Sequence, residues 1–511
     1  MTRTTIAAIA AIALVLGCAG PAASPAPSTA PGGSPAASPS TSPSASGEGA
    51  LRLLDGRPMR TCRLHGGAAL CGTLAVPENP NDPSGRQIDL NVAVIPARSA
   101  EPEPDPVFML AGGPGGAAID TFGWTFNMFS RLNATRDFVL VDQRGTGGSN
   151  RLVSPTSPDV TGMDEPTRDS TIKAWVADTL AAMPGDPRFY TTSLAMDDVD
   201  AVREALGYDK INLYGPSYGA TAAQYYLRQH EEHVRAAVFD GGTLLDVPVF
   251  ERMAANSQHA LDLLFGRCDA DAACHAAFPD LESEFDAVLD RLTAEPVSTT
   301  IVHPGSGEPI VFDTTTFAAG VHSALIDAST SSRLPALLHL AFLGQWDAVA
   351  EAIVQAAGGQ ASDEEQLAMS AIIRCSEAWA RYDPAEVERT GAGSYALALQ
   401  LAGARAQADS CRYIPAGVVP ADDAEPVRSD VPVLLVLGEA DPQDPESNVE
   451  DAPTELPNSL TVVVPGMGHT VAHLGCMPSI VVAFIEAGTV DGLDVSCAAT
   501  GVPYPSFWIP N

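Results

Sequence analysis

The chain is long and strongly acidic. It has 511 residues, of which 63 are acidic and 28 basic, and its formal net charge at pH 7 is -35. This length exceeds what one hydrophobic core usually supports, so we expect a large domain carrying an insertion, or two domains. The negative charge would repel a polyanion, and we therefore expect no nucleic-acid partner.

The first residues have the layout of an export signal. An early arginine precedes an apolar run from Ile6 to Leu16, which is too short to span a bilayer as a permanent helix. The stretch resembles a bacterial lipoprotein signal, in which the cysteine after a small residue, here Cys18, becomes the lipidated N-terminus. We predict a signal peptide at residues 1–17. The protein is then exported, either attached to the membrane only through a lipid anchor at Cys18 or secreted.

Residues 18–50 consist mainly of proline, serine, alanine and threonine. Such a segment has too few large apolar side chains to offset the entropy of folding. We predict a disordered tether that holds the folded body away from the membrane.

The chain contains nine cysteines, and lipidation of Cys18 would leave eight. An exported protein meets an oxidising environment in which disulfides persist. Proximity in the sequence alone suggests four pairs: Cys62–Cys71, Cys268–Cys274, Cys375–Cys411 and Cys476–Cys497. The chain has no C-x-x-C motif and its histidines do not cluster with the cysteines, so we expect no zinc site.

Short apolar runs that end in glycine-rich or polar loops alternate with helical patterns after residue 51. The expected strands are 88–97, 106–116, 137–149, 210–215 and 234–242, and the expected helices are 193–207, capped by Ser193 and ended by Gly207, and 220–230. This order predicts a doubly wound, mostly parallel α/β sheet that is buried on both faces.

A long insertion follows this first part of the sheet. Residues 246–428 are alanine-rich and helical in period, with one strand-like patch at 298–312. Apolar strands return at 431–445 and 460–470. We therefore divide the body into a first core part at 51–245, a helical cap at 246–428 and a second core part at 429–511.

Residues 215–219 read Gly-Pro-Ser-Tyr-Gly, which fits the motif G-x-S-x-G. A strand is expected before the motif and a helix after it, the context in which such a serine is a nucleophile. The two glycines would allow a strained turn whose neighbours lie too close for side chains. We predict that Ser217 is the nucleophile.

A serine nucleophile needs a base and an acid that orients the base, and with this motif they follow the serine in the order acid, histidine. His469 lies in the loop after the last expected strand. Asp441 ends the preceding strand and is the favoured acid, with Glu439 and Asp444 as nearby alternatives.

Acyl transfer also needs N–H donors for the oxyanion. The glycine loop 111–116 has backbone N–H groups that no side chain covers, and we favour Gly113 over Gly112 as one donor. The second donor would be Tyr218, the residue after the nucleophile. No lysine follows the glycines, which argues against a phosphate-binding loop.

With these residues in place, the chain resembles the α/β-hydrolase superfamily and, within it, the proline iminopeptidase and tripeptidyl aminopeptidase family. The resemblance extends from about Cys62 to the end. It rests on GGPGG, DQRGTGGS, YGPSYGA, GEADPQDP and GMGHT in the family's order and spacing. Ala111 stands where the family usually has histidine, and Asp444-Pro445 where it has Thr-Pro, which keeps Asp444 open as the acid.

The resemblance implies a helical cap whose carboxylates bind the free amino group of a peptide. Glu377, in the segment IIRCSE, matches that feature, although a surface glutamate would look the same. The expected function is that of an exported serine aminopeptidase, monomeric and without metal or organic cofactor, that acts on peptides. A carboxylesterase or other ester or amide hydrolase is the alternative, and a noncatalytic surface binding protein of the same fold is a third hypothesis.

Overall fold

The computed structural model describes residues 52–510 except 123–128, 156, 159, 161–162, 304–306 and 358–363. The predicted signal peptide, the predicted tether and Cys18 lie outside the described residues. Among the helices that are described, none combines the length and the apolar character needed to cross a bilayer.

A nine-stranded sheet forms the centre of the molecule, with the strand order β13-β12-β9-β8-β6-β7-β5-β4-β3. Its strands are β3 (Arg60–Leu64), β4 (Gly67–Pro77), β5 (Gln87–Ile95), β6 (Val107–Met109), β7 (Phe138–Val141), β8 (Ile211–Pro216), β9 (Val234–Asp240), β12 (Val433–Gly438) and β13 (Ser459–Val464). The six strands from β13 to β7 pair in parallel, and β5, β4 and β3 add antiparallel strands at one edge. A separate short hairpin consists of β1 (Leu53–Leu54) and β2 (Arg57–Pro58). The predicted α/β-hydrolase architecture, with a mostly parallel sheet, is confirmed.

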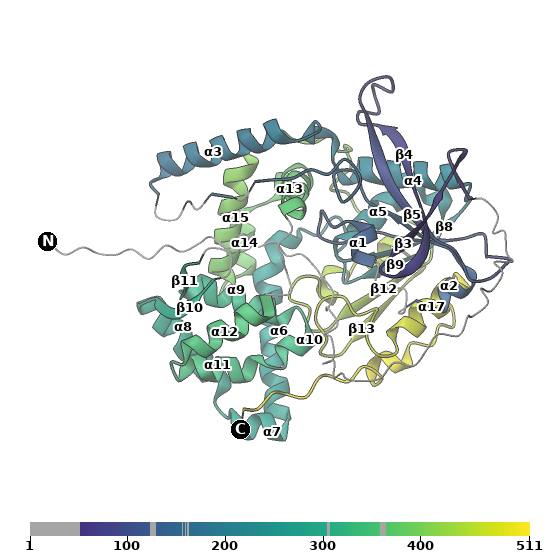
Figure 1. Ribbon diagram of the computed structural model, residues 1–511. Coiled ribbons are helices and arrows are strands. Elements are labelled where there is room, and N and C mark those ends of the chain that lie inside the picture. Colours follow the sequence, from purple (N-terminus) through teal and green to yellow (C-terminus); the bar gives the residue numbers. More distant parts are fainter. Residues whose placement is uncertain are drawn as a thin grey trace, which may run out of the picture.

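Helices cover both faces of this sheet (Figure 1). One face packs against α4 (Thr192–Leu206), α5 (Tyr218–His230) and α16 (Ala452–Glu455), and the other against α1 (Ala118–Phe122), α2 (Leu132–Thr135) and α17 (Met477–Ala487). All residues of β7 and β12 are buried, because a parallel strand between two helical layers has no solvent face.

Helix α4 starts earlier than its sequence suggests. Its N-cap is Thr191 and not Ser193, and its C-cap is Gly207 in the left-handed conformation, with φ of 79°. The predicted cap was wrong because a side chain from a distant segment binds the first turn: Glu377 accepts a hydrogen bond from the Thr192 N–H. A tertiary contact thus sets the start of this helix.

A mainly helical region is inserted between β9 and β12 and packs around its own apolar cluster. It contains α6 (Val249–Ala270), α7 (Ala272–Ala277), α8 (Leu281–Ala294), the hairpin β10 (Val297–Val302) and β11 (Pro309–Phe312), α9 (Thr314–Leu325), α10 (Ala328–Ser331), α11 (Leu334–Phe342), α12 (Trp346–Ala357), α13 (Glu364–Ile373), α14 (Pro384–Thr390) and α15 (Leu397–Cys411).

A helix from before the candidate nucleophile also joins this region. Helix α3 (Glu165–Ala182) lies beside α15 (Figure 1). Asp169 pairs with Arg412 at 2.8 Å and Arg168 with Asp409 at 3.4 Å. The division of the sequence at residue 246 did not include this helix in the cap.

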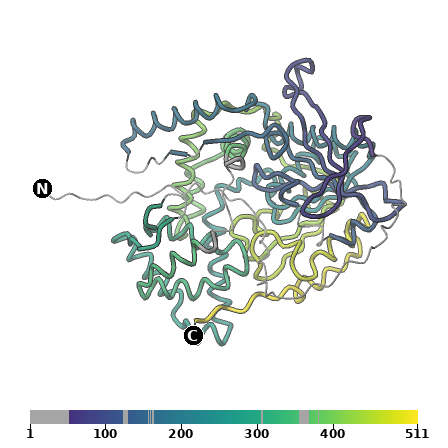
Figure 2. Tube along the Cα trace, in the orientation of Figure 1, coloured from purple at the N-terminus to yellow at the C-terminus, as the bar shows by residue number. Residues whose placement is uncertain are grey.

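The last residues of the chain connect the two halves of the molecule. After α17 the chain runs along the body to the helical region (Figure 2). There the Tyr504 hydroxyl lies 2.7 Å from Ser331 Oγ, and the Trp508 N–H donates to the Ser332 carbonyl at 3.1 Å. The C-terminal segment thereby ties the inserted helices to the sheet.

Four disulfides form within the described part of the chain, and they are the pairs expected from proximity in the sequence: Cys62–Cys71, Cys268–Cys274, Cys375–Cys411 and Cys476–Cys497. The first bridges the neighbouring strands β3 and β4. The third joins the π-helical turn after α13 to the end of α15. Each bridge therefore closes a local unit.

Candidate active site

Ser217 lies at a sharp turn between β8 and α5. Its φ is 55°, a conformation that is strained for a residue with a side chain. A Cβ on Gly215 would collide with the Gly219 carbonyl oxygen, and a Cβ on Gly219 with the Leu110 carbonyl oxygen. Only glycine fits at these two positions, which explains the spacing of the motif around Ser217.

Asp441 and His469 meet in the interior, next to the carboxyl ends of β12 and β13. The His469 Nδ1 lies 2.7 Å from Asp441 Oδ2, and Asp441 is fully buried. Asp441 Oδ1 accepts hydrogen bonds from the N–H groups of Gln443 and Asp444 at 2.8 and 3.0 Å. These backbone bonds hold the carboxylate in the orientation that faces the imidazole.

The two alternative acids are placed differently. Asp444 Oδ2 is 3.6 Å from His469 Nδ1, beyond hydrogen-bonding distance, and its carboxylate accepts from the Thr243 hydroxyl. Burial and the neighbouring Asp441 raise the pKa of Asp444, while His469 opposes the shift. Glu439 instead pairs with Arg267 at 2.9 Å and accepts from the Gly466 N–H at 2.8 Å. Of the three acids, Asp441 alone is hydrogen-bonded to His469.

Asp240, at the end of β9, connects the turn of the nucleophile to the loop of the histidine. Its backbone carbonyl accepts from the Ser217 N–H at 2.8 Å. Its carboxylate accepts from the N–H groups of Val471 and Ala472 at 2.6 and 3.1 Å, and from the Tyr214 hydroxyl at 2.8 Å. No motif in the sequence singles out Asp240, and the available signal was a carboxylate directly after the apolar run Ala236–Phe239.

The helical region also holds the histidine loop. The His469 N–H donates to the Ile326 carbonyl, just after α9, at 2.8 Å. His322 of α9 lies near the same site and shares a hydrogen bond of 2.7 Å with the Ser257 hydroxyl. Burial lowers the pKa of His322 to about 4, partly opposed by Asp441, so the imidazole is neutral at pH 7. Because His322 is neutral, it does not disfavour protonation of His469 as a positively charged neighbour would.

A cavity of about 150 Å³ joins the candidate nucleophile to the predicted oxyanion donors, since Ser217, Gly113 and Tyr218 all line it. The glycine loop approaches the serine closely: a Cβ on Gly112 would lie 3.4 Å from Ser217 Cβ. Tyr218 is the first residue of α5, and the N–H groups of a first helical turn have no partner within the helix. The predicted nucleophile and donors thus share one cavity.

Glu377 lines the same cavity and is almost completely buried. Its two oxygens accept from the Thr192 N–H and the Thr192 hydroxyl, each at 2.7 Å. Burial raises the pKa of Glu377 to about 8, although the bonds from Thr192 oppose the shift. At pH 7 the free carboxyl group is therefore mostly protonated.

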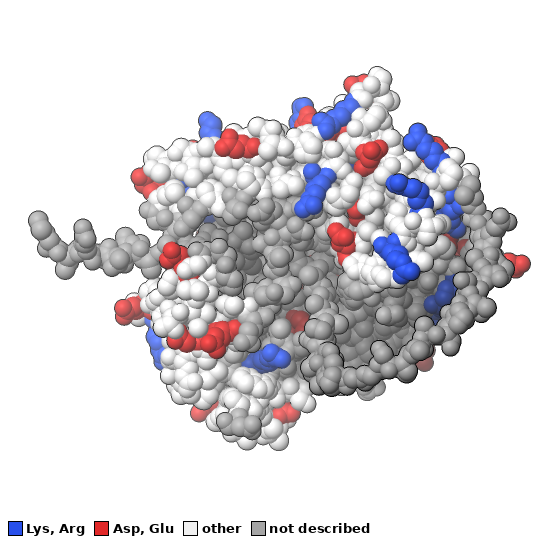
Figure 3. Space-filling model, viewed as in Figure 1, with Lys and Arg blue, Asp and Glu red and all other residues white. Residues whose placement is uncertain are grey.

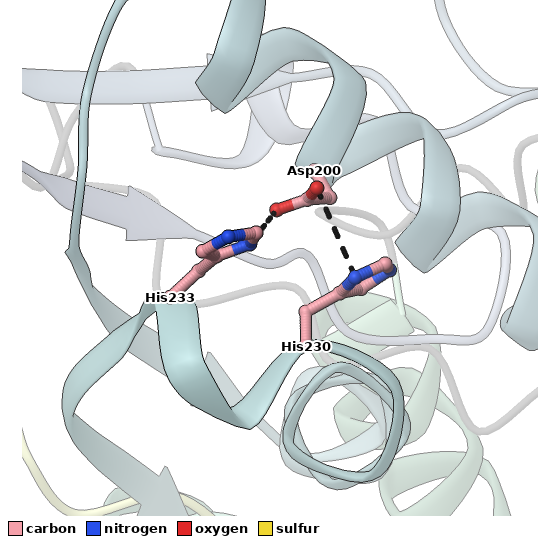
Figure 4. A group of neighbouring side chains, drawn as sticks. All are labelled: Asp200, His230 and His233. Carbon is pink, nitrogen blue, oxygen red and sulfur yellow. Dashed lines mark hydrogen bonds and ion pairs between the residues drawn. The ribbon is translucent and has the colours of Figure 1, made fainter.

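A group with the composition of a metal site, Asp200, His230 and His233, lies on the side of the sheet covered by α4 and α5 (Figure 4). Asp200 Oδ1 accepts from Arg203 at 2.6 Å and from the Tyr226 hydroxyl at 2.7 Å. Burial opposes the shift, but these bonds lower the pKa of Asp200 to about 2. Because Arg203 already donates a hydrogen bond to the Asp200 carboxylate, we assign this group a structural role. The other such group in the described part of the chain is Asp441, Asp444 and His469 itself.

Two family models match parts of the chain. Residues 105–297, which include the turn of Ser217, match the family model described as alpha/beta hydrolase fold, and residues 400–497, which include Asp441 and His469, match the model described as TAP-like protein. The chain belongs to the α/β-hydrolase superfamily.

Known relatives of this α/β-hydrolase include peptidases. The serine protease Hip1 of Mycobacterium tuberculosis strain H37Rv is 28% identical over 229 residues, which is 41% of this chain and 43% of the relative. The tripeptidyl aminopeptidase of Streptomyces lividans is 28% identical over 186 residues, or 33% of this chain and 34% of the relative. The matches thus span less than half the length of these curated relatives. A proline iminopeptidase structure from Mycobacterium smegmatis shares 16% identity, covering 82% of this chain and 98% of that one, with a TM-score of 0.37.

Proposed function

We propose that this α/β-hydrolase is an exported serine aminopeptidase that releases short N-terminal units, from one amino acid to a tripeptide, through an acyl-enzyme. The observation that carries the proposal is the Asp441–His469 hydrogen bond of 2.7 Å next to the strained turn of Ser217. The peptidase relatives and the TAP-like match support the choice of substrate. The signal expected at residues 1–17 supports export.

In this proposal Ser217 Oγ attacks the scissile carbonyl carbon while His469 Nε2 takes the hydroxyl proton. The Asp441 carboxylate keeps Nδ1 protonated and stabilises the imidazolium. The N–H groups of Gly113 and Tyr218 bind the oxyanion. His469 then gives the proton to the leaving amine, and water, activated by the same imidazole, hydrolyses the acyl-enzyme.

Glu377 supplies amine recognition in this proposal. A free ammonium group in the cavity would favour the ionised carboxylate and form a charge-assisted hydrogen bond with it. Since the free carboxyl group has a pKa of about 8, ammonium binding at lower pH requires loss of its proton. Binding should strengthen as the pH rises toward 8, until the substrate amine itself loses its proton.

The test compares chromogenic aminoacyl and tripeptidyl amides with their N-acetylated counterparts. Wild-type protein should cleave the free-amine substrates faster, with a KM that falls between pH 6 and pH 8. Glu377→Gln can keep both hydrogen bonds to Thr192, and it should raise the KM for free-amine substrates and remove its pH dependence. Equal rates on free and blocked substrates in both proteins would refute amine recognition.

A carboxylesterase or another ester or amide hydrolase is the second candidate function. The observation that favours it is that both oxygens of Glu377 already accept hydrogen bonds from Thr192, as a purely structural carboxyl group would. In that case simple aryl esters should be cleaved equally well with and without a free amino group. Loss of ester hydrolysis in Ser217→Ala, with no cleavage of free-amine peptides by wild type, would favour this function.

A further inference from the structure

Arg374 is one of four charged residues that line the cavity containing Ser217; the others are Glu377, Arg381 and Asp444. It opens the π-helical turn Arg374–Ala378, one turn before Glu377, and lines the cavity. Its guanidinium lies over the ring of Phe250, with Cζ 5.2 Å from the ring centroid. An aromatic face therefore holds the cation from one side.

The guanidinium of Arg374 has no anionic partner among the described residues. Its buried Nε–H finds no acceptor there, and burial by itself lowers the pKa of Arg374 to about 10. Arg374 is partly exposed, and two arginines that are buried more completely have ionic partners: Arg144 pairs with Asp198 at 2.7 Å and Arg136 with Asp105 at 2.9 Å. Arg381 also lines the cavity with a buried Nε–H that has no described acceptor, but its Nη1 donates to the Leu245 carbonyl at 2.7 Å. A largely desolvated charge without an ionic partner is costly, so the position of Arg374 calls for an explanation.

The carboxyl groups of the cavity do not compensate Arg374. Glu377 accepts from Thr192, and Asp444 accepts from Thr243 and faces His469. Among the described residues, no carboxylate of the cavity is therefore left to pair with the guanidinium, which can instead bind an anionic group of a substrate.

We propose that Arg374 determines specificity for a substrate carboxylate, namely the side chain of an aspartate or glutamate in the acyl part of the substrate. The inference rests on the proposed function, because the acyl group must lie in the cavity beside Ser217. A planar guanidinium can bind a carboxylate through two parallel hydrogen bonds, which a lysine cannot match.

The size and the walls of the cavity fit this group. Its volume of about 150 Å³ is below the roughly 300–1,000 Å³ of pockets for drug-sized ligands, so it suits a single side chain. Leu244, Leu245 and Met253 also line the cavity and can contact the methylene groups of a glutamate. The carboxylate end would then reach Arg374 beside Phe250.

The kinetic test uses glutamyl and glutaminyl p-nitroanilides, which have nearly the same shape and differ in charge, each with a free and an acetylated amine. Wild type should favour the glutamyl substrate by about 10- to 100-fold in kcat/KM, the range of a charge-assisted hydrogen bond. Arg374→Gln should remove this preference mainly through KM, and Arg374→Lys should keep part of it.

Arg389→Gln, which changes an exposed arginine of α14, is the matched control and should keep the full preference. The same preference in wild type and Arg374→Gln, or none in wild type, would overturn the proposal.

A binding experiment separates this inference from the proposed function. Ser217→Ala cannot turn over the anilides, so their dissociation constants can be measured by calorimetry with and without Arg374→Gln. Tighter glutamyl binding that depends on Arg374 supports the inference even if wild type cleaves neither anilide. Equal binding of both anilides, with cleavage by wild type, refutes the inference alone.

Thermal unfolding tests whether Arg374 serves only to stabilise the fold. Removing a partly buried charge that has no ionic partner among the described residues should leave the melting temperature of Arg374→Gln unchanged or higher. A lowered melting temperature with an unchanged substrate preference would assign Arg374 a structural role. If Arg374→Gln does not fold, the glutamyl anilide should still raise the melting temperature of Ser217→Ala more than the glutaminyl anilide does, and equal shifts would reject the proposal.

Discussion

Two carboxyl groups three residues apart, Asp441 and Asp444, approach the same imidazole, and the hydrogen bonds predict which of them serves catalysis. Asp441→Asn should lower kcat by about 10⁴-fold with little change in KM, because the amide no longer holds the Nδ1–H tautomer of His469. Asp444→Asn, which changes a group 3.6 Å from Nδ1, should lower kcat by less than about tenfold. Steady-state kinetics on one substrate checks both variants, and an equal loss in the two would contradict the assignment.

The candidate residues differ in how far the sequence could predict them. Ser217 and His469 could be proposed because the glycine spacing and the loop after the last strand constrain them locally. The choice between Asp441 and Asp444 depends on backbone hydrogen bonds from residues 443 and 444, which no local pattern reveals. Asp240 and Arg374 depend on contacts between segments far apart in the chain, so the sequence analysis did not select them.

At the scale of elements, the disulfide Cys375–Cys411 anchors the turn that carries Arg374 and Glu377 to α15. Replacing both cysteines by alanine should lower the free energy of unfolding by about 3–4 kcal/mol, the loop-closure value for a separation of 36 residues. The KM of the proposed substrates should rise more than kcat falls, since the bridge positions binding groups and not the nucleophile.

Denaturant unfolding and steady-state kinetics measure these two effects of the disulfide. Replacing Cys62 and Cys71 by alanine, in the β3–β4 hairpin, is the control and should leave KM unchanged. A KM increase of the same size in both variants would argue against a local role for Cys375–Cys411.

The strands of the central sheet could be predicted from the sequence where the apolar runs are short and end in glycine. The central strands β6, β7, β9 and β12 lie within expected segments, and β8 and β13 each extend one residue beyond theirs, at Pro216 and Ser459. The antiparallel edge β3–β4 was not expected, because its residues are partly exposed and show no continuous apolar run. Helix α3 was not assigned to the cap because its ion pairs with α15 link residues more than 200 positions apart.

At the scale of the whole molecule, the charge should affect stability. The net charge is -35, and on the face shown in Figure 3 the basic side chains gather over the sheet half, while acidic ones occur on both halves. Self-repulsion of this kind destabilises the compact state and is screened by salt, with a Debye length of about 10 Å at 0.1 M. The melting temperature should therefore rise as NaCl increases from about 0.01 to 0.3 M. Calorimetry at several salt concentrations measures it, and a decrease would show that surface ion pairs outweigh repulsion.

The proposed chemistry requires that Ser217 is a nucleophile activated by His469. The most direct measurement is covalent labelling with a fluorophosphonate probe, followed by mass spectrometry of the labelled peptide. We predict stoichiometric modification of Ser217 in wild type, none in Ser217→Ala, and labelling slowed by orders of magnitude in His469→Ala. Unlabelled wild-type protein, or labelling that persists in Ser217→Ala, would contradict the account.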